Sequence, residues 1–281
     1  LVLVGNGHWD VRMTTVSTPS LIPPYTLLGN PSAGEGVCSD DFYVMTHSGD
    51  VLPEMPVGRI PAEDATDLAS ITAKSLAYAE GASAGDWVNR MIFLADDEWG
   101  NGMNQSETVH TIDCEKLAED HAPRYAHREK VYLIEYPWPS GGGHPEKEEA
   151  REDFIMEYSR GSAFMAFIGH GSPNQITNEK VLRGSDVPLL TNSARLPLTY
   201  WGTCNVGQFD IPGSTCIGGR LVASPEGGGV ASVAATRGTF SGPNYSLGAA
   251  LIDSLYGSDA GHSMGTATWL EIDGEKTVQQ I

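Results

Sequence analysis

The sequence is poor in three features that would point to common protein classes. Basic residues are scarce: 17 Lys and Arg against 36 Asp and Glu give a net charge of −19, so nucleic acid is not an expected partner. Long apolar runs are absent, and no segment approaches the roughly 18 apolar residues of a membrane span. Cysteine is also scarce. The chain of 281 residues has four, without the CxxC spacing of a zinc site, so we expect no zinc site and at most one disulfide; they are Cys38, Cys114, Cys204 and Cys216.

A dinucleotide-binding fingerprint is begun but not completed. Gly5–Asn6–Gly7 opens like a glycine-rich loop, but Asp10 stands where the third glycine belongs and no helical pattern follows. We therefore expect no dinucleotide at this loop, and no cofactor that a reaction of this protein would require. The first residues, Leu1–Val4, already look like a core strand without a basic leader, which predicts a fragment of a longer precursor rather than a signal peptide.

Apolar runs alternate with helical patterns along most of the chain. The strands are expected at Leu1–Val4, Met55–Ile60, Met91–Ala95, Lys130–Glu135, Ala163–Ile168, Leu196–Gly202 and Gly229–Ala235, and the helices at Ala62–Glu80, Glu107–His121, Pro145–Arg160, Ser214–Ala223 and Asn244–Tyr256. This order predicts an α/β fold with a mainly parallel sheet covered by helices on both faces. Residues 12–50 are expected to form long loops. The break at Gly81–Gly85 is expected to divide the chain into an N-terminal α/β subdomain, 1–85, which we expect to be truncated at its start, and a second, catalytic subdomain, 86–281.

Reactive side chains follow three of the expected strands. His170 comes after the run Ala163–Ile168, Cys204 after Leu196–Gly202, and the pair Asp96–Asp97 after Met91–Ala95. Ligands of open α/β sheets bind beyond the carboxyl ends of the strands, where these side chains would meet.

A cysteine, a histidine and a carboxylate at one edge are the parts of a nucleophile, its base and an orienting acid. The backbone amides of Gly171 and Cys204 would then form an oxyanion hole. The alternatives are a cysteine that is only a small apolar residue and a histidine that is only part of a loop.

Several ordered segments resemble the gingipain family of cysteine peptidases across roughly residues 1–256. In the second half these are Ile168–Ser172 (IGHGS), Leu190–Leu198, Gly202–Asp210 and Gly228–Arg237; in the first half they are Val2–Gly7, Ser39–Tyr43 (SDDFY), Val57–Pro61 (VGRIP) and Ala95–Asp97. The resemblance implies a caspase-like fold in two subdomains and a cysteine endopeptidase acting on proteins or peptides.

The resemblance also implies roles for single residues. His170 and Cys204 would be the catalytic dyad, and Asp96 the third catalytic acid, with Asp97 as the alternative. Glu107 resembles the acid that binds a basic side chain of the substrate; it would equally serve as a favourable acid in the first turn of a helix.

The family has two branches, which differ in function. One contains secreted endopeptidases. The other is the surface sortase of the type IX secretion system, a transpeptidase that processes C-terminal signal domains. Gly218–Gly219 stands where both branches commonly have a glutamate, so this segment assigns the chain to neither branch.

Because both branches act outside the cell, the resemblance implies a secreted or cell-surface protein, with type IX secretion components as candidate partners. A scaffold without catalysis is the remaining alternative.

Paired acids in two loops are candidates for a structural calcium ion. They are Asp40–Asp41 and Asp96–Asp97–Glu98, whose carboxylates are the hard oxygen ligands that calcium prefers. Solvated acids that bind no ion are the alternative for both loops.

Overall fold

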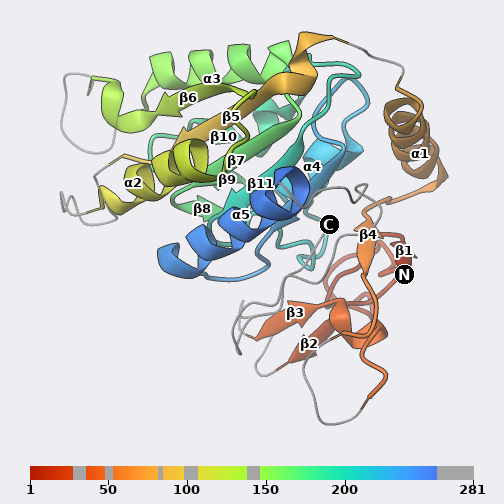
Figure 1. The fold of residues 1–281 in the computed structure, drawn as a ribbon. Coiled ribbons are helices and arrows are strands. Elements are labelled where there is room, and N and C mark those ends of the chain that lie inside the picture. The colour runs from red at the N-terminus through yellow and green to blue at the C-terminus, as the bar shows by residue number, and fades with distance from the viewer. Residues whose placement is uncertain (28–35, 48–52, 82–84, 98–106, 138–145, 258–281) are drawn as a thin grey trace.

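The computed structural model describes residues 1–27, 36–47, 53–81, 85–97, 107–137 and 146–257. Its largest element is a five-stranded parallel sheet in the order β12-β11-β7-β5-β6 (Figure 1). The strands are β5 (Arg90–Ala95), β6 (His127–Tyr132), β7 (Phe164–Ile168), β11 (Leu198–Gly202) and β12 (Ala231–Ala234). The sheet confirms the α/β class predicted from the sequence.

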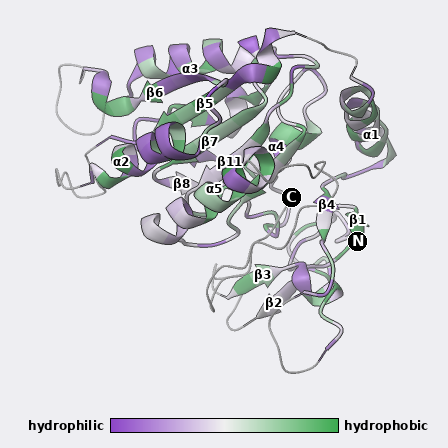
Figure 2. Ribbon diagram, viewed as in Figure 1, coloured by the Kyte–Doolittle hydropathy of each residue, from purple (hydrophilic) through white to green (hydrophobic). Residues whose placement is uncertain are grey.

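Helices cover both faces of this sheet. On one side lie α2 (Val109–Lys116) and α5 (Ser241–Tyr256), and on the other α3 (Glu148–Arg160) and α4 (Ile217–Ala223) (Figure 1). Along β7, Phe164, Ala166 and Ile168 join the α2/α5 face, whereas Met165 and Phe167 join the α3/α4 face. Side chains alternate across a strand, so a continuous apolar run supplies two cores at once. Figure 2 shows the resulting contrast between hydrophobic strands and the hydrophilic surface of α3.

The N-terminal region contains two small sheets and one long helix. β1 (Val2–Val4) pairs in parallel with β4 (Gly58–Ile60), and β2 (Tyr25–Leu27) pairs antiparallel with β3 (Val37–Ser39). The helix α1 (Ala65–Ala79) is capped at its N-terminus by Asp64, whose carboxylate accepts hydrogen bonds from the backbone N–H groups of Thr66 and Asp67. A side-chain oxygen at this position satisfies donors that have no partner inside the helix.

The N-terminal region is joined to the large sheet by polar contacts. The Lys74 ammonium of α1 donates to the carbonyl oxygens of Leu221, Ser224 and Gly227 at 2.9–3.2 Å, around the end of α4. Burial lowers the pKa of Lys74 to about 8. The Thr236 hydroxyl, beyond β12, donates to the Cys38 carbonyl of β3 at 3.0 Å. Whether 1–85 and 86–281 act as separate subdomains stays a prediction.

Two expectations about local structure were wrong, and one small sheet was not anticipated. Residues 12–50 contain the β2–β3 hairpin and a 3₁₀ turn at Asp41–Tyr43 instead of loops alone. The strand expected at Lys130–Glu135 runs from His127 to Tyr132, and Leu133–Glu135 is a 3₁₀ turn. The sheet that was not anticipated follows His170 and is made of β8 (Gly171–Ser172), β9 (Gln175–Ile176) and β10 (Leu182–Arg183).

Candidate active site

The candidate site lies where three neighbouring parallel strands end. β7 is paired with β5 on one side and with β11 on the other, so Ala95, Ile168 and Gly202 lie side by side. Hydrogen bonds continue this alignment: the Asp96 N–H donates to the Ile168 carbonyl at 3.0 Å, and the Gly169 N–H to the Gly202 carbonyl at 3.4 Å. The segments carrying Asp96, His170 and Cys204 therefore leave the sheet together.

His170 is held on two sides by acids. Its backbone N–H donates to Asp96 Oδ2 at 2.9 Å, and its Nε2 donates to Glu107 Oε2 at 2.5 Å. The ring also meets that of His110 edge to face, with 5.1 Å between the ring centroids. Glu107 lies two residues before α2 and His110 in its first turn, and the His110 N–H donates to the Glu107 carbonyl at 3.2 Å, so this short segment presents both side chains toward His170. The imidazole remains partly exposed, as access for a substrate requires.

Asp96 is almost completely buried, and its carboxylate holds backbone rather than a side chain. Besides the His170 N–H it accepts the Asp97 N–H at 3.1 Å. Burial raises the pKa of Asp96 well above its usual value, and the neighbouring Glu179 and Asp97 carboxylates add to the shift. Burial likewise lowers the pKa of His110, with a further contribution from His170. Asp96 and His110 thus lie in a buried, low-dielectric environment, whereas the His170 imidazole is more exposed.

Cys204 lies two residues beyond the end of β11 and is partly exposed. Its Sγ accepts the Thr239 N–H at 3.2 Å and lies 3.6 Å from the Thr239 carbonyl oxygen. Thr239 belongs to the segment between β12 and α5, so a fourth part of the chain borders the thiol. Asn205, the next residue, has a positive φ of 61°, which turns the backbone sharply after the cysteine.

The glycine after His170 brings the two reactive segments into contact. A Cβ at Gly171 would lie 2.5 Å from Thr203 Oγ1 and 2.9 Å from the Cys204 carbonyl oxygen. A side chain at this position would push the histidine and cysteine segments apart. The close approach favours glycine here and places the Gly171 backbone beside Cys204.

The candidate residues from the sequence are partly brought together. Asp96, His170, Gly171 and Cys204 gather at the strand ends, and Glu107, expected to bind substrate, rests on His170. Asp97 instead makes an ion pair with Lys147, 2.8 Å from Asp97 Oδ2 to Nζ, with both side chains buried. Glu98 lies outside the described residues. His110 and Thr239 were not singled out from the sequence, although the spacing of His110 from Glu107 was the available signal.

The two acid pairs considered for calcium have different surroundings. Both carboxylate oxygens of Asp40 accept hydrogen bonds from Arg59, at 2.7 and 2.8 Å. One oxygen each of Asp96, Asp97 and Glu179 lie within 4.8 Å of one another. A calcium ion at Asp40–Asp41 would compete with Arg59 for the Asp40 carboxylate. An ion at Asp96–Asp97 would compete with Lys147 for the Asp97 carboxylate. Structural calcium stays a prediction.

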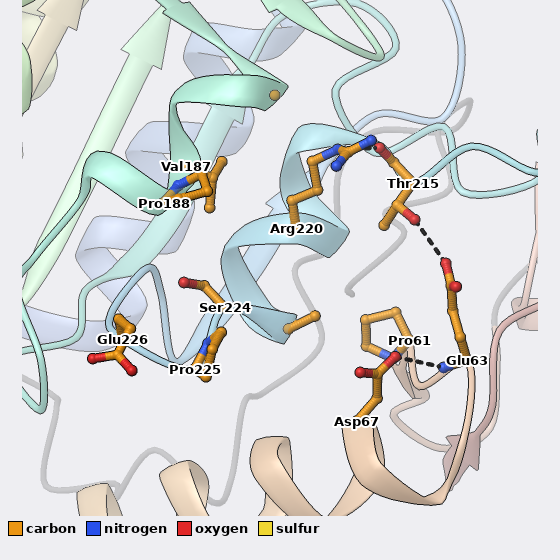
Figure 3. Close-up of a pocket in the computed structure, with 12 residues that line it drawn as sticks. Pro61, Glu63, Asp67, Val187, Pro188, Thr215, Arg220, Ser224, Pro225 and Glu226 are labelled. Atoms are coloured by element: carbon orange, nitrogen blue, oxygen red, sulfur yellow. Dashed lines mark hydrogen bonds between the residues drawn. The ribbon is translucent and has the colours of Figure 1, made fainter.

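A separate cavity of about 420 Å³ lies between the start of α1, α4 and the 3₁₀ segment Gly184–Leu189 (Figure 3). Its lining includes Glu63, Asp67, Glu226 and Arg220, and Glu63 accepts a hydrogen bond from Thr215 there. Neither Cys204 nor His170 lines it. The cavity is therefore distinct from the candidate residues at the strand ends.

Comparison with known proteins gives the class of this molecule. A family model described as peptidase family C25 matches residues 1–277. The chain therefore belongs to peptidase family C25. Among curated proteins, no significant match was found.

Solved structures of gingipains share the fold. The Arg-specific cysteine proteinase gingipain R is 19% identical, with a TM-score of 0.62 over 90% of this chain and 52% of that chain. A complex of the pro- and mature domains of RgpB from Porphyromonas gingivalis gives 19% identity and a TM-score of 0.61, over 90% and 53%. The chain thus spans about half the length of the structures it matches.

Among the described helices, none has the length and apolar character needed to cross a bilayer.

Proposed function

We propose that the protein is a cysteine endopeptidase in which Cys204 is the nucleophile and His170 the general base. The Cys204 sulfur attacks the carbonyl carbon of the scissile bond while His170 takes the thiol proton. His170 then gives this proton to the leaving amine, and a thioester remains on Cys204. Water, deprotonated by His170, hydrolyses the thioester and restores the thiol. The observation that carries this proposal is the alignment of Ile168 with Gly202, two residues before His170 and Cys204.

Two acids would support the imidazole in different ways. Glu107 contacts the ring directly and would hold it in one tautomer, with the proton on Nε2. Asp96, the acid expected from the sequence, accepts the backbone N–H of His170 and would fix where the segment leaves β7. The amides of Gly171 and Cys204 would donate to the developing oxyanion. The close approach of the Gly171 backbone to Cys204 supports that pairing.

Replacing the nucleophile tests the proposal most directly. In Cys204→Ala we expect kcat to fall by at least about 10³-fold, because the chemical step loses its covalent route. The melting temperature should change little, since Sγ is partly exposed and its hydrogen bonds are weak ones with Thr239. Peptide hydrolysis near the wild-type rate would exclude Cys204 as the nucleophile.

Selective alkylation provides a second test that needs no substrate. Cys38, Cys114 and Cys216 are buried, and burial raises the pKa of each, that of Cys216 to about 11. A thiol activated by an imidazole reacts with iodoacetamide at pH 6, whereas buried thiols do not. We expect labelling of Cys204 alone, slowed in His170→Ala. Mass spectrometry of the digested protein shows which cysteine carries the label.

Glu107 is further proposed to select a basic side chain before the scissile bond. A partly exposed carboxylate beside the imidazole is placed to pair with a guanidinium, which it would bind better than an ammonium. Glu107→Gln removes the charge but keeps a group that can hydrogen-bond to His170. We expect the ratio of kcat/KM for Arg over Leu substrates to fall roughly tenfold or more. The net charge of −19 also attracts basic substrates, but salt screens this long-range effect first, so high-salt assays isolate the pocket.

The sortase branch offers a second outcome of the same thioester. If an amine instead of water attacks it, the product is a transpeptidated protein, as in a sortase of the type IX secretion system. Mass analysis of a cleaved peptide with and without an added amine separates the two, because hydrolysis adds water to the fragment. Either activity fits the proposal of a secreted or cell-surface protein. If the protein shows neither hydrolysis nor transpeptidation, a scaffold without catalysis is favoured.

A further inference from the structure

Three possible metal ligands, one of them the imidazole of His170, meet at the candidate active site. Among the described residues, one carboxylate oxygen of Asp96 and one ring nitrogen each of His110 and His170 lie within 4.8 Å of one another. Zinc bonds nitrogen and oxygen at about 2.0–2.2 Å, so small rotations bring donors this close onto one ion. Two imidazoles and a carboxylate are a donor set typical of zinc sites that keep one position open.

Lone pairs are available on all three side chains. His110 Nδ1 is buried without a hydrogen-bond partner in the described part of the chain, and the side chain as a whole is only 8% exposed. Each Asp96 oxygen accepts a single backbone N–H, which leaves it a second lone pair. Because Glu107 binds Nε2 of His170, the free lone pair of that ring is on Nδ1.

The contact between Glu107 and His170 is the kind of support that metal-binding histidines have. A ligating histidine usually donates its other ring N–H to a carboxylate, which fixes the ring and makes the ligating nitrogen more basic. Glu107 supplies this carboxylate at 2.5 Å. The buried unpaired nitrogen of His110 is the observation that points to a ligand, and the Glu107 contact fits His170 as one of the groups that would bind it.

We propose that Asp96, His110 and His170 form an inhibitory site for a transition-metal ion such as Zn²⁺. The ion would take the lone pair with which His170 accepts the thiol proton, so metal binding and catalysis exclude each other. The site uses no cysteine, in contrast to the CxxC sites excluded from the sequence. It also differs from the group of Asp96, Asp97 and Glu179, where the Lys147 ammonium already supplies a positive charge.

Calorimetry with zinc chloride on the Cys204→Ala variant tests binding without the thiol and without any need for activity. We expect one ion per chain, and a dissociation constant at least about 30-fold weaker when His110→Ala is added. His121→Ala is the matched control, since His121 is bound to Asp253 and Tyr245; it should leave the constant unchanged. If His110→Ala does not fold, as judged by circular dichroism, His110→Gln replaces it.

Inhibition is measured separately, in chains that keep Cys204. Zinc should inhibit peptide hydrolysis in the wild type and in His121→Ala at the same concentration, and His110→Ala should require at least about 30-fold more. Equal zinc sensitivity of His110→Ala and the wild type would overturn the site, because His110 would then not be a ligand. Absence of zinc binding to Cys204→Ala in calorimetry would overturn it too, because the three proposed ligands are all present in that variant. Absence of peptidase activity would contradict the proposed function but leave the binding test intact.

Discussion

The parallel sheet and the N-terminal region are stabilised by different interactions. The strands β5, β7 and β11 are covered on both faces by apolar side chains, and Phe167 and Trp201 meet edge to face between neighbouring strands. In the N-terminal region the described sheets have two strands each, and apolar residues in and beside them are often exposed, as Val2 and Phe42 are. Small sheets bury too little surface to stabilise themselves, so polar contacts have a larger part there.

Arg59 is the centre of that polar network. Its guanidinium donates to both oxygens of Asp40 and to the carbonyls of Gly5 and Ile22, and it lies 4.6 Å from the centre of the Phe209 ring. One side chain thus joins β1, the β2–β3 hairpin and the segment after Cys204. The resemblance segments SDDFY and VGRIP contain the two members of this ion pair, which gives them a structural role.

Removing Arg59 should have the largest effect on stability. In Arg59→Ala the Asp40 carboxylate stays buried without its partner, and we expect a loss of about 3–5 kcal/mol in the free energy of unfolding. Arg59→Lys should recover only part of this, because an ammonium cannot donate two parallel bonds to one carboxylate. Urea denaturation measures both. A loss below about 0.5 kcal/mol, as expected for the exposed control Arg124→Ala, would contradict the role of this network.

This difference explains what the sequence could and could not predict about the fold. The strands β5, β7 and β11 were placed within two residues, because a strand buried on both faces is a continuous apolar run. β6 was placed three residues late at its start, since it is an edge strand whose first residues, His127–Lys130, are polar. The β2–β3 hairpin was missed, because three-residue strands among Pro, Ser and Gly have no usable period.

The same holds for the candidate site. Asp96, His170 and Cys204 follow buried strands, so their convergence follows from strand order alone. His110 reaches the site from the first turn of α2, Glu107 from the residues just before it, and Thr239 from a segment beyond β12. These contacts depend on packing. The contact of Glu107 with His170 Nε2 therefore required the structure, although the residue itself was singled out from the sequence.

A conservative change in the sheet should have a smaller effect than loss of Arg59. Phe167→Leu keeps most of the buried volume but removes the edge-to-face contact with Trp201, 6.1 Å between centroids. We expect a loss of about 1–2 kcal/mol, because apolar cores tolerate substitutions of similar size. Urea denaturation is again the measurement. A loss of unfolding free energy above that of Arg59→Ala would show that close packing in the sheet contributes more to stability than the Arg59 network does.

The smallest effect is expected on the exposed face of the N-terminal region. Phe42 stacks on Tyr25 with 4.1 Å between ring centroids and 9° between planes, yet it remains 52% exposed. Phe42→Ala loses this stacking and little burial, so we expect a loss of about 0.5–1.5 kcal/mol. Tyr25→Ala should have a similar effect, and the double variant should cost less than the sum of the two, because both remove the same contact. Additive losses would mean that the stacked pair contributes nothing of its own.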